Sequence, residues 1–543
     1  MNTTEPKPIP LLPVVLCLFG LIVAFHVGSA LTGRSFIRAS HLGTALEYAQ
    51  GKIDLLRPVI VGFNANGAPT AQELPVWQAL AAATFKATGS RWYGWANLVS
   101  LALFATALPP FLRLSRRYVG ERAAWWATAF FLAQPIIVVM AGEAATDGFC
   151  LVVTIWFVFF ADKMLRTGNG WWWFPTALFG ALGAISKLPF FMAAGIFAAF
   201  LLLVKSRDRS ATLVADSERG VSGPKAADPP VWRLWILLAS AGAFAAVVFV
   251  VWTRYADSLS SQAEYQYVEL RLSKSHFITA WYFGDMGSRL SLGPWLKGGW
   301  RFLHATLGSL PLAGLLIAAL VQRGNRIPKL WLLATFLTTL VFTHLILAHW
   351  HYYLMCCPAV ALLCGATLAR WEEFWTREMP RQCLRLGLAL IVLVFSATEG
   401  LMAMKIGIDY DPYPKDMAAL LRQHTKPEDK LIVYNCDVIW GGEVLYRSDR
   451  NGMCVARLTK SPDAPTEKGL IDLLTSEADL SWLKSMGYNK LVLISQSPVQ
   501  FAAVAINPGS KRRRIYYPAT ISPEVDKWPE VYRSEDLLIK DIP

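Results

Sequence analysis

The sequence is poor in charged residues: only 17% of its 543 residues are Asp, Glu, Lys or Arg, against about 25% in soluble domains. Hydrophobic residues make up 54% of the chain and include 22 tryptophans. This shortage of charge excludes an ordinary soluble enzyme and indicates a polytopic membrane protein. The net charge of +13 does not point to nucleic acid, because basic residues in membrane proteins usually hold cytoplasmic loops in place. No nucleic-acid partner is expected.

The eight cysteines lack the spacing of a metal-binding motif, so they do not predict a structural metal site. Most of them fall in or beside apolar segments, where a thiol behaves as a small hydrophobe. These are Cys17, Cys150, Cys356, Cys357, Cys364 and Cys383. Cys436 and Cys454 lie instead in a polar tail. They form either one disulfide, if that tail is exported, or two unrelated thiols.

The first apolar run, after "MNTTEPKPIP", lacks a convincing small-residue cleavage site, so we interpret it as a retained helix rather than a signal peptide. Spanning a bilayer needs about 20 apolar residues, and eleven segments are predicted to span it. They are residues 11–31, 94–112, 123–141, 148–162, 172–186, 188–204, 234–252, 303–322, 330–348, 352–369 and 386–404. The fifth and sixth are separated only by "SKLP", so they form either a hairpin or one long bent element.

Lys and Arg are distributed unevenly between the connections. If the first helix runs from inside to outside, the inner connections, such as "RLSRRYVGER" and "RGNRIPK", are denser in them than the long outer loops 32–91 and 253–302. This asymmetry follows the positive-inside rule. It places "AGEAATD", "SKLP" and "AHWHYY" on the outer face, so the unusual polar residues gather at one interface. An active site is expected there.

The composition changes after about residue 405. "KLIVYN" and "NKLVLIS" read as buried strands, and "YPKDMAALLRQHT" and "SEADLSWLKSMGY" read as helices. We therefore predict a membrane domain over residues 1–404 and a small, soluble α/β domain over residues 405–543, on the outer side of the membrane.

Glu143 and Asp147 interrupt an apolar stretch, "VVMAGEAATDGFCLVV". A charge at the centre of a bilayer costs at least about 2.5 to 3.5 kcal/mol, so such acids usually mark a function or a helix end in water. Four residues apart, they would share one face if the segment were helical, and could bind a divalent cation or act as a base. Alternatively, Glu143 ends one helix and Asp147 caps the next.

Two further groups of polar residues lie at the same predicted interface. Lys187 stands alone in "GAISKLPFF", where it either snorkels towards water or faces a lipid phosphate. "LAHWHYYLMCCPAVALL" supplies His351, Tyr352 and Tyr353. Aromatic residues at this depth are usually interface anchors.

In this order the motifs resemble the GT-C membrane glycosyltransferases of the aminoarabinose transferase and protein O-mannosyltransferase superfamily. The matching pieces are a large outer loop ending in "QELPVWQAL", the basic turn "RLSRRYVGERAAWWAT", the outer acid of "TDGFCLVVTIWFVFF", "SKLPFF" and "HYYLMCCPAVALL". The resemblance covers residues 10–400, and it implies a GT-C-like fold of about 11 transmembrane helices. It also implies transfer of a sugar, with inversion, from a polyprenyl-phosphate donor to an acceptor outside the cytoplasm.

The resemblance also implies roles for individual residues. Asp147 would order the site or bind a metal, Mg²⁺ or Mn²⁺ being the only cofactor suggested. Lys187 would lie near the donor phosphate. The other predicted donor-phosphate ligands are His351, Tyr352, Tyr353 and, more loosely, Arg271 and Lys274.

One departure from the family concerns the general base. The family usually has an Asp soon after the first helix, whereas "TGRSFIRASHLGTALEYAQG" supplies Arg34, Arg38 and His41 and no acid before Glu47. An anionic phosphate acceptor would need no base and would suit these three residues. Otherwise another acid replaces the base, or the chain is not a transferase of the usual kind. The replacements are Glu47, Asp54, Glu73 and Glu143.

These observations predict an inner-membrane glycosyltransferase of the cell envelope, with its site and C-terminal domain on the periplasmic side. Its partners would be the lipid-linked sugar donor and a lipid, glycan or protein acceptor. The alternatives are a lipid-linked glycan transporter or flippase, which usually shows internal repeats and polar residues at the midplane, and a non-catalytic membrane assembly protein.

Overall fold

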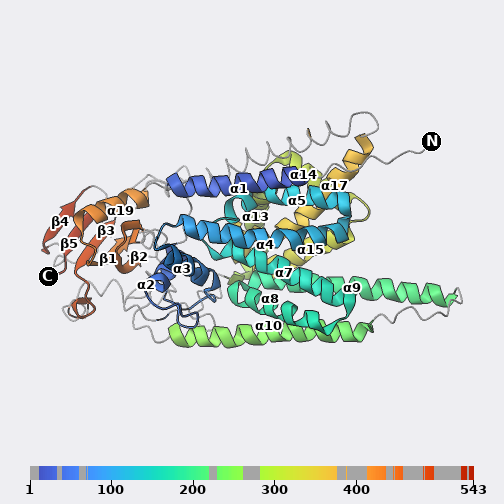
Figure 1. Cartoon of the computed structure of the whole chain (residues 1–543), viewed down its shortest axis with the longest axis horizontal. Helices are drawn as coiled ribbons and strands as arrows, with labels where there is room; N and C mark the ends of the chain where they lie inside the picture. The colour runs from blue at the N-terminus through green and yellow to red at the C-terminus, as the bar shows by residue number, and fades with distance from the viewer. Residues whose placement is uncertain are drawn as a thin grey trace. The chain divides into compact units, whose positions relative to one another are not determined.

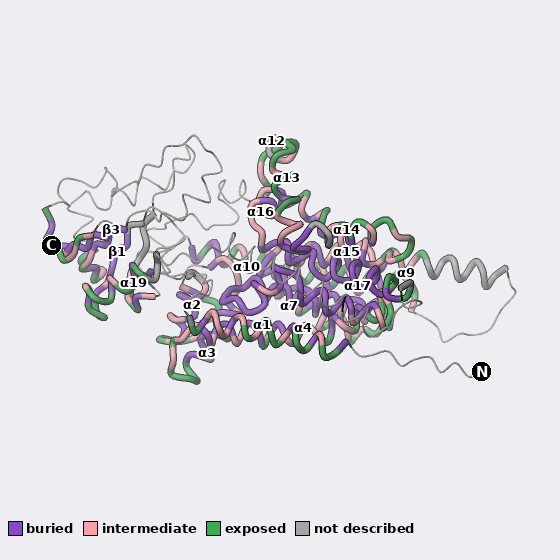
Figure 2. The backbone as a smooth tube through the Cα atoms, turned by 90° about the horizontal axis from the view of Figure 1, so that it is seen from above, coloured by how far each residue is buried: buried purple, intermediate pink, exposed green. Residues whose placement is uncertain are grey.

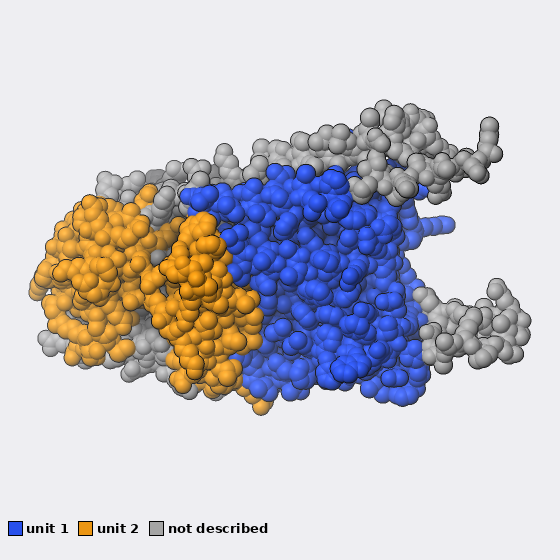
Figure 3. All heavy atoms as spheres, in the orientation of Figure 1, with its two compact units in different colours: residues 1–33, 97–252, 280–408 blue, residues 34–96, 253–279, 409–543 orange. Residues whose placement is uncertain are grey.

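A computed structural model describes most of the chain. The described residues are 11–32, 39–59, 69, 71–218, 229–260, 282–375, 387, 413–435, 444–445, 447–456, 481, 483–494, 527–534 and 537–543. Arg34, Arg38, Arg271, Lys274 and the predicted disulfide partner Cys436 lie outside them, as does nearly all of the predicted last span. Two compact units emerge (Figure 3): residues 1–33, 97–252 and 280–408, and residues 34–96, 253–279 and 409–543.

The first unit is helical in its described part. Its elements are α1 (Leu12–Thr32), α4 (Gly94–Val119), α5 (Glu121–Ala133), α6 (Pro135–Met140), α7 (Thr146–Thr167), η1 (Gly170–Trp172), α8 (Trp173–Ser186), α9 (Leu188–Glu218), α10 (Val231–Ser260), α12 (Met286–Leu290), α13 (Leu292–Phe302), η2 (Leu303–Leu307), α14 (Leu310–Val321), α15 (Arg326–Val341), α16 (Thr343–Ala348), η3 (Trp350–Cys356) and α17 (Cys357–Trp375). Among the described residues, six helices are long and apolar enough to cross a bilayer, or seven if one bent pair is a single span. The chain is thus a polytopic helical membrane protein, as predicted. Its predicted total of eleven spans stays a prediction.

One predicted span, 123–141, is interrupted in the structure. Helix α5 ends at Ala133 and α6 begins at Pro135, with Gln134 extended between them at φ −62° and ψ 130°. The cause is local, because a proline ring clashes with a helical conformation of the preceding residue. The break lies a few residues before the segment that carries Glu143 and leads into α7 at Asp147.

Helix α17 is the most enclosed helix of the first unit. Residues 351–369, which comprise most of α17 and the 3₁₀ segment before it, are all buried, and α17 is drawn mostly in the colour of burial in Figure 2. Gly365 packs so closely on α5 that a Cβ there would lie 2.4 Å from the backbone nitrogen of Ala127. Ala361 and Ala369 extend this small-residue face of α17 by one turn each way. Small residues at this spacing let two membrane helices approach closely.

Helices α8 and α9 fold back on each other. Gly180 and Gly183 of α8 both face Phe191 of α9, and a Cβ added at either would lie 3.3 or 3.5 Å from that side chain. Such contacts are impossible along one continuous helix, where residues 183 and 191 would be about 12 Å apart. The pair therefore forms a hairpin that packs on α7 (Figure 1), with Lys187 at its tip in an extended conformation.

The second unit contains α2 (Ala39–Gln50), α3 (Val76–Thr88), α19 (Tyr413–His424) and a five-stranded sheet. The strands are β1 (Lys430–Asn435), β2 (Asn451–Ala456), β3 (Lys490–Ile494), β4 (Glu530–Arg533) and β5 (Leu537–Asp541). Their order is β2-β1-β3-β5-β4, with β1 parallel to β2 and β3, and with β5 antiparallel to β3 and β4. The two central parallel strands, β1 and β3, coincide with the apolar runs "KLIVYN" and "NKLVLIS".

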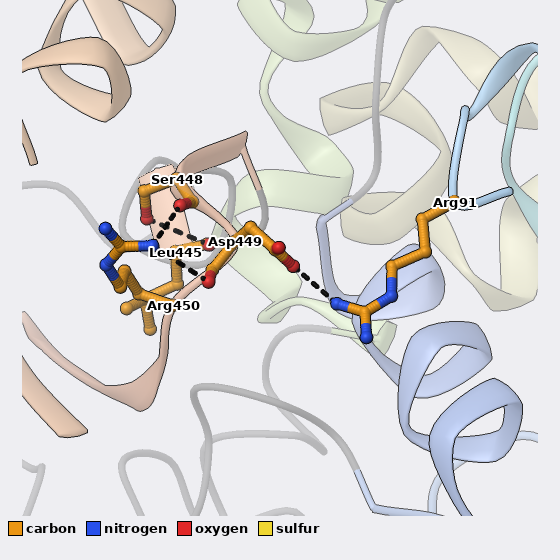
Figure 4. Close-up of polar contacts among 5 residues, drawn as sticks. All are labelled: Arg91, Leu445, Ser448, Asp449 and Arg450. Carbon is orange, nitrogen blue, oxygen red and sulfur yellow. Dashed lines mark hydrogen bonds and ion pairs between the residues drawn. The ribbon is translucent and has the colours of Figure 1, made fainter. Parts of the chain in front are cut away.

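An ion pair joins two distant stretches of sequence within this unit (Figure 4). Arg91 Nη1 lies 2.5 Å from Asp449 Oδ1. Asp449 has a positive φ of 56°, which Asp tolerates better than most residues. Arg450 donates to the carbonyls of Ser448 and Asp449, and Ser448 donates to that of Leu445. These bonds shape the turn that presents Asp449 to Arg91.

Candidate active site

Asp147 is the second residue of α7 and is completely buried. Glu143 is also buried, at 3% exposure, but it lies in the turn before the helix. The two acids therefore do not share a helical face, and Asp147 does not cap α7, whose N-cap is Ala145. The turn is tight: a Cβ at Gly148 would lie 2.6 Å from the carbonyl oxygen of Met140.

The hairpin tip brings Lys187 to Asp147. The Lys187 ammonium donates directly to Asp147 Oδ1, and only 5% of the Lys187 side chain is exposed. Lys187 therefore does not snorkel into water. Burying both ions carries a large desolvation penalty, which an ion pair offsets only in good geometry. A buried pair of this kind inside a membrane protein is by default a functional-site hypothesis.

The 3₁₀ segment η3 adds His351 and Tyr352 to this pair. His351 Nε2 lies 3.8 Å from Asp147 Oδ1, and the Lys187 ammonium lies 5.2 Å from the centre of the Tyr352 ring. The two rings are themselves 4.6 Å apart. Four of the predicted site residues, from three separate parts of the sequence, thus converge. We call Asp147, Lys187, His351 and Tyr352 the Asp147 cluster.

Tyr353 bonds a different neighbour, in α13. Its hydroxyl donates to the carbonyl of Gly298, 2.9 Å away in α13. A 3₁₀ helix turns about 120° per residue, so consecutive side chains of η3 point to different neighbours. Tyr353 thereby ties η3 to α13.

Two further residues, which no sequence pattern indicated, hold the turn before α7. His26 Nε2 of α1 lies 2.8 Å from the carbonyl oxygen of Val138 and 3.2 Å from the backbone nitrogen of Gly142. Ser100 of α4 donates to the carbonyl of Glu143 over 2.7 Å. A Cβ on Gly142 would come within 2.5 Å of the His26 ring. His26 could not be predicted to do this, because one polar residue in an apolar helix does not indicate which segment it contacts.

The remaining predicted residues described by the structure belong to the second unit. Glu47 is partly buried in α2, where burial raises the pKa of its carboxyl and the charge of Lys430 opposes this shift. The His41 ring lies 6.4 Å from that of Trp77. Asp54 Oδ1 accepts from the backbone N–H of Leu56 over 3.0 Å, so this carboxylate stabilises a turn.

No three His, Cys, Asp or Glu side chains meet as a metal site within the described residues. The Asp147 carboxylate already faces the Lys187 ammonium, and a second cation beside it would be repelled. These residues fit a divalent cation poorly. The proposed Mg²⁺ or Mn²⁺ at Asp147 stays a prediction, and no step below passes through a metal.

Neither a known family model nor a curated protein matches the sequence. Solved structures do match. ArnT from Cupriavidus metallidurans in the apo state superposes with a TM-score of 0.57 at 16% identity, over 97% of this chain and 98% of that chain. The same protein bound to undecaprenyl phosphate gives 0.56 at 15% identity, over the same shares of the two chains. Arabinofuranosyltransferase AftD from Mycobacteria gives 0.51 at 13% identity, over 96% of this chain and 41% of that chain. The likeness shows that the chain has the GT-C fold that the motifs predicted.

Proposed function

We propose that the chain is an integral-membrane glycosyltransferase that moves a sugar from a polyprenyl-phosphate donor to an acceptor outside the cytoplasm. The observation that carries this proposal is the Asp147 cluster, in which a buried ion pair meets His351 and Tyr352. The GT-C fold supports it. So does the binding of undecaprenyl phosphate by ArnT from Cupriavidus metallidurans, which has the same fold.

The proposed chemistry is a displacement at the anomeric carbon of the donor sugar. The acceptor oxygen attacks this carbon, the bond to the lipid phosphate oxygen breaks, and the configuration inverts. The bonding electrons stay on the departing phosphate, whose negative charge grows. The Lys187 ammonium would stabilise this charge, and a protonated His351 Nε2 would donate a hydrogen bond to it. Asp147 would hold both donors in place before the donor binds.

A hydroxyl acceptor must also lose a proton. Glu143, four residues before Asp147, is the proposed base, and Glu47 is the alternative. Glu143 is buried at 3% exposure and lies close in sequence to Asp147, which supports its choice as the base. A phosphate acceptor is already anionic and would need neither residue.

We further propose an inner-membrane location with the Asp147 cluster at the periplasmic interface. The higher density of Lys and Arg in the connections at the other ends of the helices supports this orientation. Transfer would then use sugars presented on that side by the lipid carrier.

The direct test is transfer by the purified protein from labelled undecaprenyl-phosphate sugars to a cell-envelope extract. Lys187→Ala should abolish transfer, whereas Lys163→Ala should retain it. Lys163 is a matched control, because it lies near the far end of α7 and stacks on the ring of Trp172, 3.7 Å from its centre. Monodisperse elution of each variant checks that it is folded. Wild-type transfer by Lys187→Ala would remove this residue from the mechanism.

A vesicle assay separates the proposal from the transporter alternative. Labelled lipid-linked sugar that crosses the bilayer without covalent change, in a protein that transfers nothing, would favour transport. Loss of function only on deletion of the C-terminal domain, with Asp147 and Lys187 dispensable, would favour an assembly protein.

A further inference from the structure

A second group of residues lies well along α9 from Lys187 and Asp147. Phe200, Leu203, Val204 and Arg207 follow the spacing i, i+3, i+4, i+7, so they lie on one face of α9. All four line the same cavity. This face is therefore apolar for one turn and ends in a guanidinium.

Helix α15 forms the opposite wall. Arg326 and Leu330, one turn apart at the start of α15, line the cavity as well. Just below it, towards the middle of α9, the rings of Phe197 and Trp331 stack at 4.5 Å and 17°. The stacked pair fixes α9 against α15 and gives the cavity a rigid apolar base. We call the cavity the α9–α15 pocket.

The position of the α9–α15 pocket along α9 is informative. Helix α9 runs without interruption from Leu188, next to Lys187, to beyond Arg207. At 1.5 Å per residue, the two cationic residues are separated by about 30 Å along the helix axis. This distance matches the hydrocarbon thickness of a bilayer. With α9 across the bilayer, this separation would place the two clusters at opposite interfaces.

The size and lining of the α9–α15 pocket restrict what it can hold. Its volume is about 440 Å³, which is ample for a phosphodiester group and the first methylenes of its chains. Two guanidiniums present planar donor pairs that suit phosphate oxygens. The apolar residues beside them would gain nothing from a small soluble anion. A ligand with a phosphate next to hydrocarbon complements both parts.

We propose that the α9–α15 pocket binds an anionic phospholipid of the leaflet opposite the Asp147 cluster. Its headgroup phosphate lies between Arg207 and Arg326, and the start of an acyl chain lies against Phe200, Leu203 and Leu330. Basic pockets between membrane helices on the cytoplasmic side are suited to such headgroups. Because Arg207 lies on α9 and Arg326 begins α15, the bound lipid bridges the two helices at this level.

The proposal is tested by titrating the purified full-length protein with phosphatidylglycerol in detergent and counting bound lipids by native mass spectrometry. We expect one retained phosphatidylglycerol and no retained phosphatidylcholine of the same acyl chains. Arg207→Gln with Arg326→Gln should weaken phosphatidylglycerol binding about 30-fold, since each basic residue contributes roughly fivefold. Arg207→Lys with Arg326→Lys, which keeps the charge, should retain part of the affinity.

The matched control is Arg233→Gln with Arg323→Gln. It removes the same charge from exposed residues outside the α9–α15 pocket and should change binding less than twofold. Equal retention of both lipids, or equal loss in the control variant, would overturn the proposal. Saturation by glycerol 3-phosphate at the affinity of the lipid would also overturn it, because the pocket would then recognise a soluble phosphate. If the Gln variant does not fold, the proposal is still tested by the Lys variant and by the comparison of phosphatidylglycerol with phosphatidylcholine.

Discussion

Two ion pairs of this molecule lie in opposite environments. Asp147 and Lys187, in the first unit, expose 0% and 5% of their side chains, whereas Arg91 and Asp449, in the second, expose 50% and 64%. Water screens the exposed pair, and such pairs are usually worth under about 1 kcal/mol. The buried pair cannot be screened in this way. Removal of Lys187 would leave the Asp147 carboxylate buried without its ammonium partner.

This comparison separates two reasons for keeping charges in a protein. The exposed pair helps to join two distant parts of the sequence, and many other contacts could replace it. A buried ion pair adds little net stability to a fold, because well-packed apolar residues in the same place often give a protein of equal or higher stability. We therefore attribute the buried pair to the proposed transfer reaction and the exposed pair to the fold. The predictions below test this difference in role.

The largest effect is expected at Lys187. Lys187→Met alone should lower the free energy of unfolding by about 3 to 5 kcal/mol, because Asp147 loses its partner. Adding Asp147→Asn should restore much of this loss, while both variants should lack transfer. Thermal unfolding in detergent and the transfer assay measure the two properties on the same samples. A double variant as unstable as the single one would show that the ion pair is mainly structural.

A smaller effect is expected in the turn before α7. Gly142→Ala places a methyl group against the His26 ring, and overpacking of this kind typically costs about 1 to 3 kcal/mol. It should also reduce transfer by displacing the turn that leads to Asp147. Gly195→Ala in α9 is the control, since nothing lies within 4 Å of the added Cβ. It should be neutral or slightly stabilising. Equal losses in both variants would contradict the role of His26 in holding this turn.

The exposed pair of Arg91 and Asp449 should matter much less than the buried pair. Arg91→Ala, Asp449→Ala and the double variant should give a coupling energy below about 1 kcal/mol, which salt weakens further. Chemical unfolding of the three variants supplies this value. A coupling energy as large as that of Asp147 with Lys187 would erase the distinction between the two regions.

The smallest effect concerns pH and Glu47. Its pKa in the folded chain is raised above the ordinary value of 4.5, mainly by burial. The folded chain therefore binds this proton more tightly than the unfolded chain, and this contribution to stability falls as the pH rises above 4.5. Glu47→Gln should remove that part of the decline. Unfolding curves of both proteins between pH 4 and about pH 7 should converge at the acidic end, and parallel curves would contradict the assignment.

Much of the site could be anticipated from the sequence, for identifiable reasons. Asp147, Lys187 and His351 are rare polar residues in apolar surroundings, and the distribution of Lys and Arg assigned them to one interface. This common depth, together with the resemblance to a known family, was enough to predict that the three residues converge. The break at Gln134 could also have been predicted, because Pro135 follows it.

Other features depend on packing that no pattern encodes. His26 reaches the turn before α7 from a helix far away in sequence, and only the rotation of α1 decides this. Glu143 was predicted to share a face with Asp147 if the segment were helical, but α7 begins too late for that. Tyr353 was grouped with Tyr352, yet the 3₁₀ geometry of η3 turns the two side chains towards different neighbours.

The close packing of Gly365 on Ala127 also has a consequence for how the chain is made. Synthesis at about 5 to 20 residues per second leaves on the order of 10 to 50 seconds between the emergence of α5 and that of its partner α17. During this interval the face of α5 around Ala127 has no α17 to cover it. Insertion into the bilayer and completion of the helical core are thus separate events in time, and a ribosome stalled before α17 would leave an open, incomplete bundle.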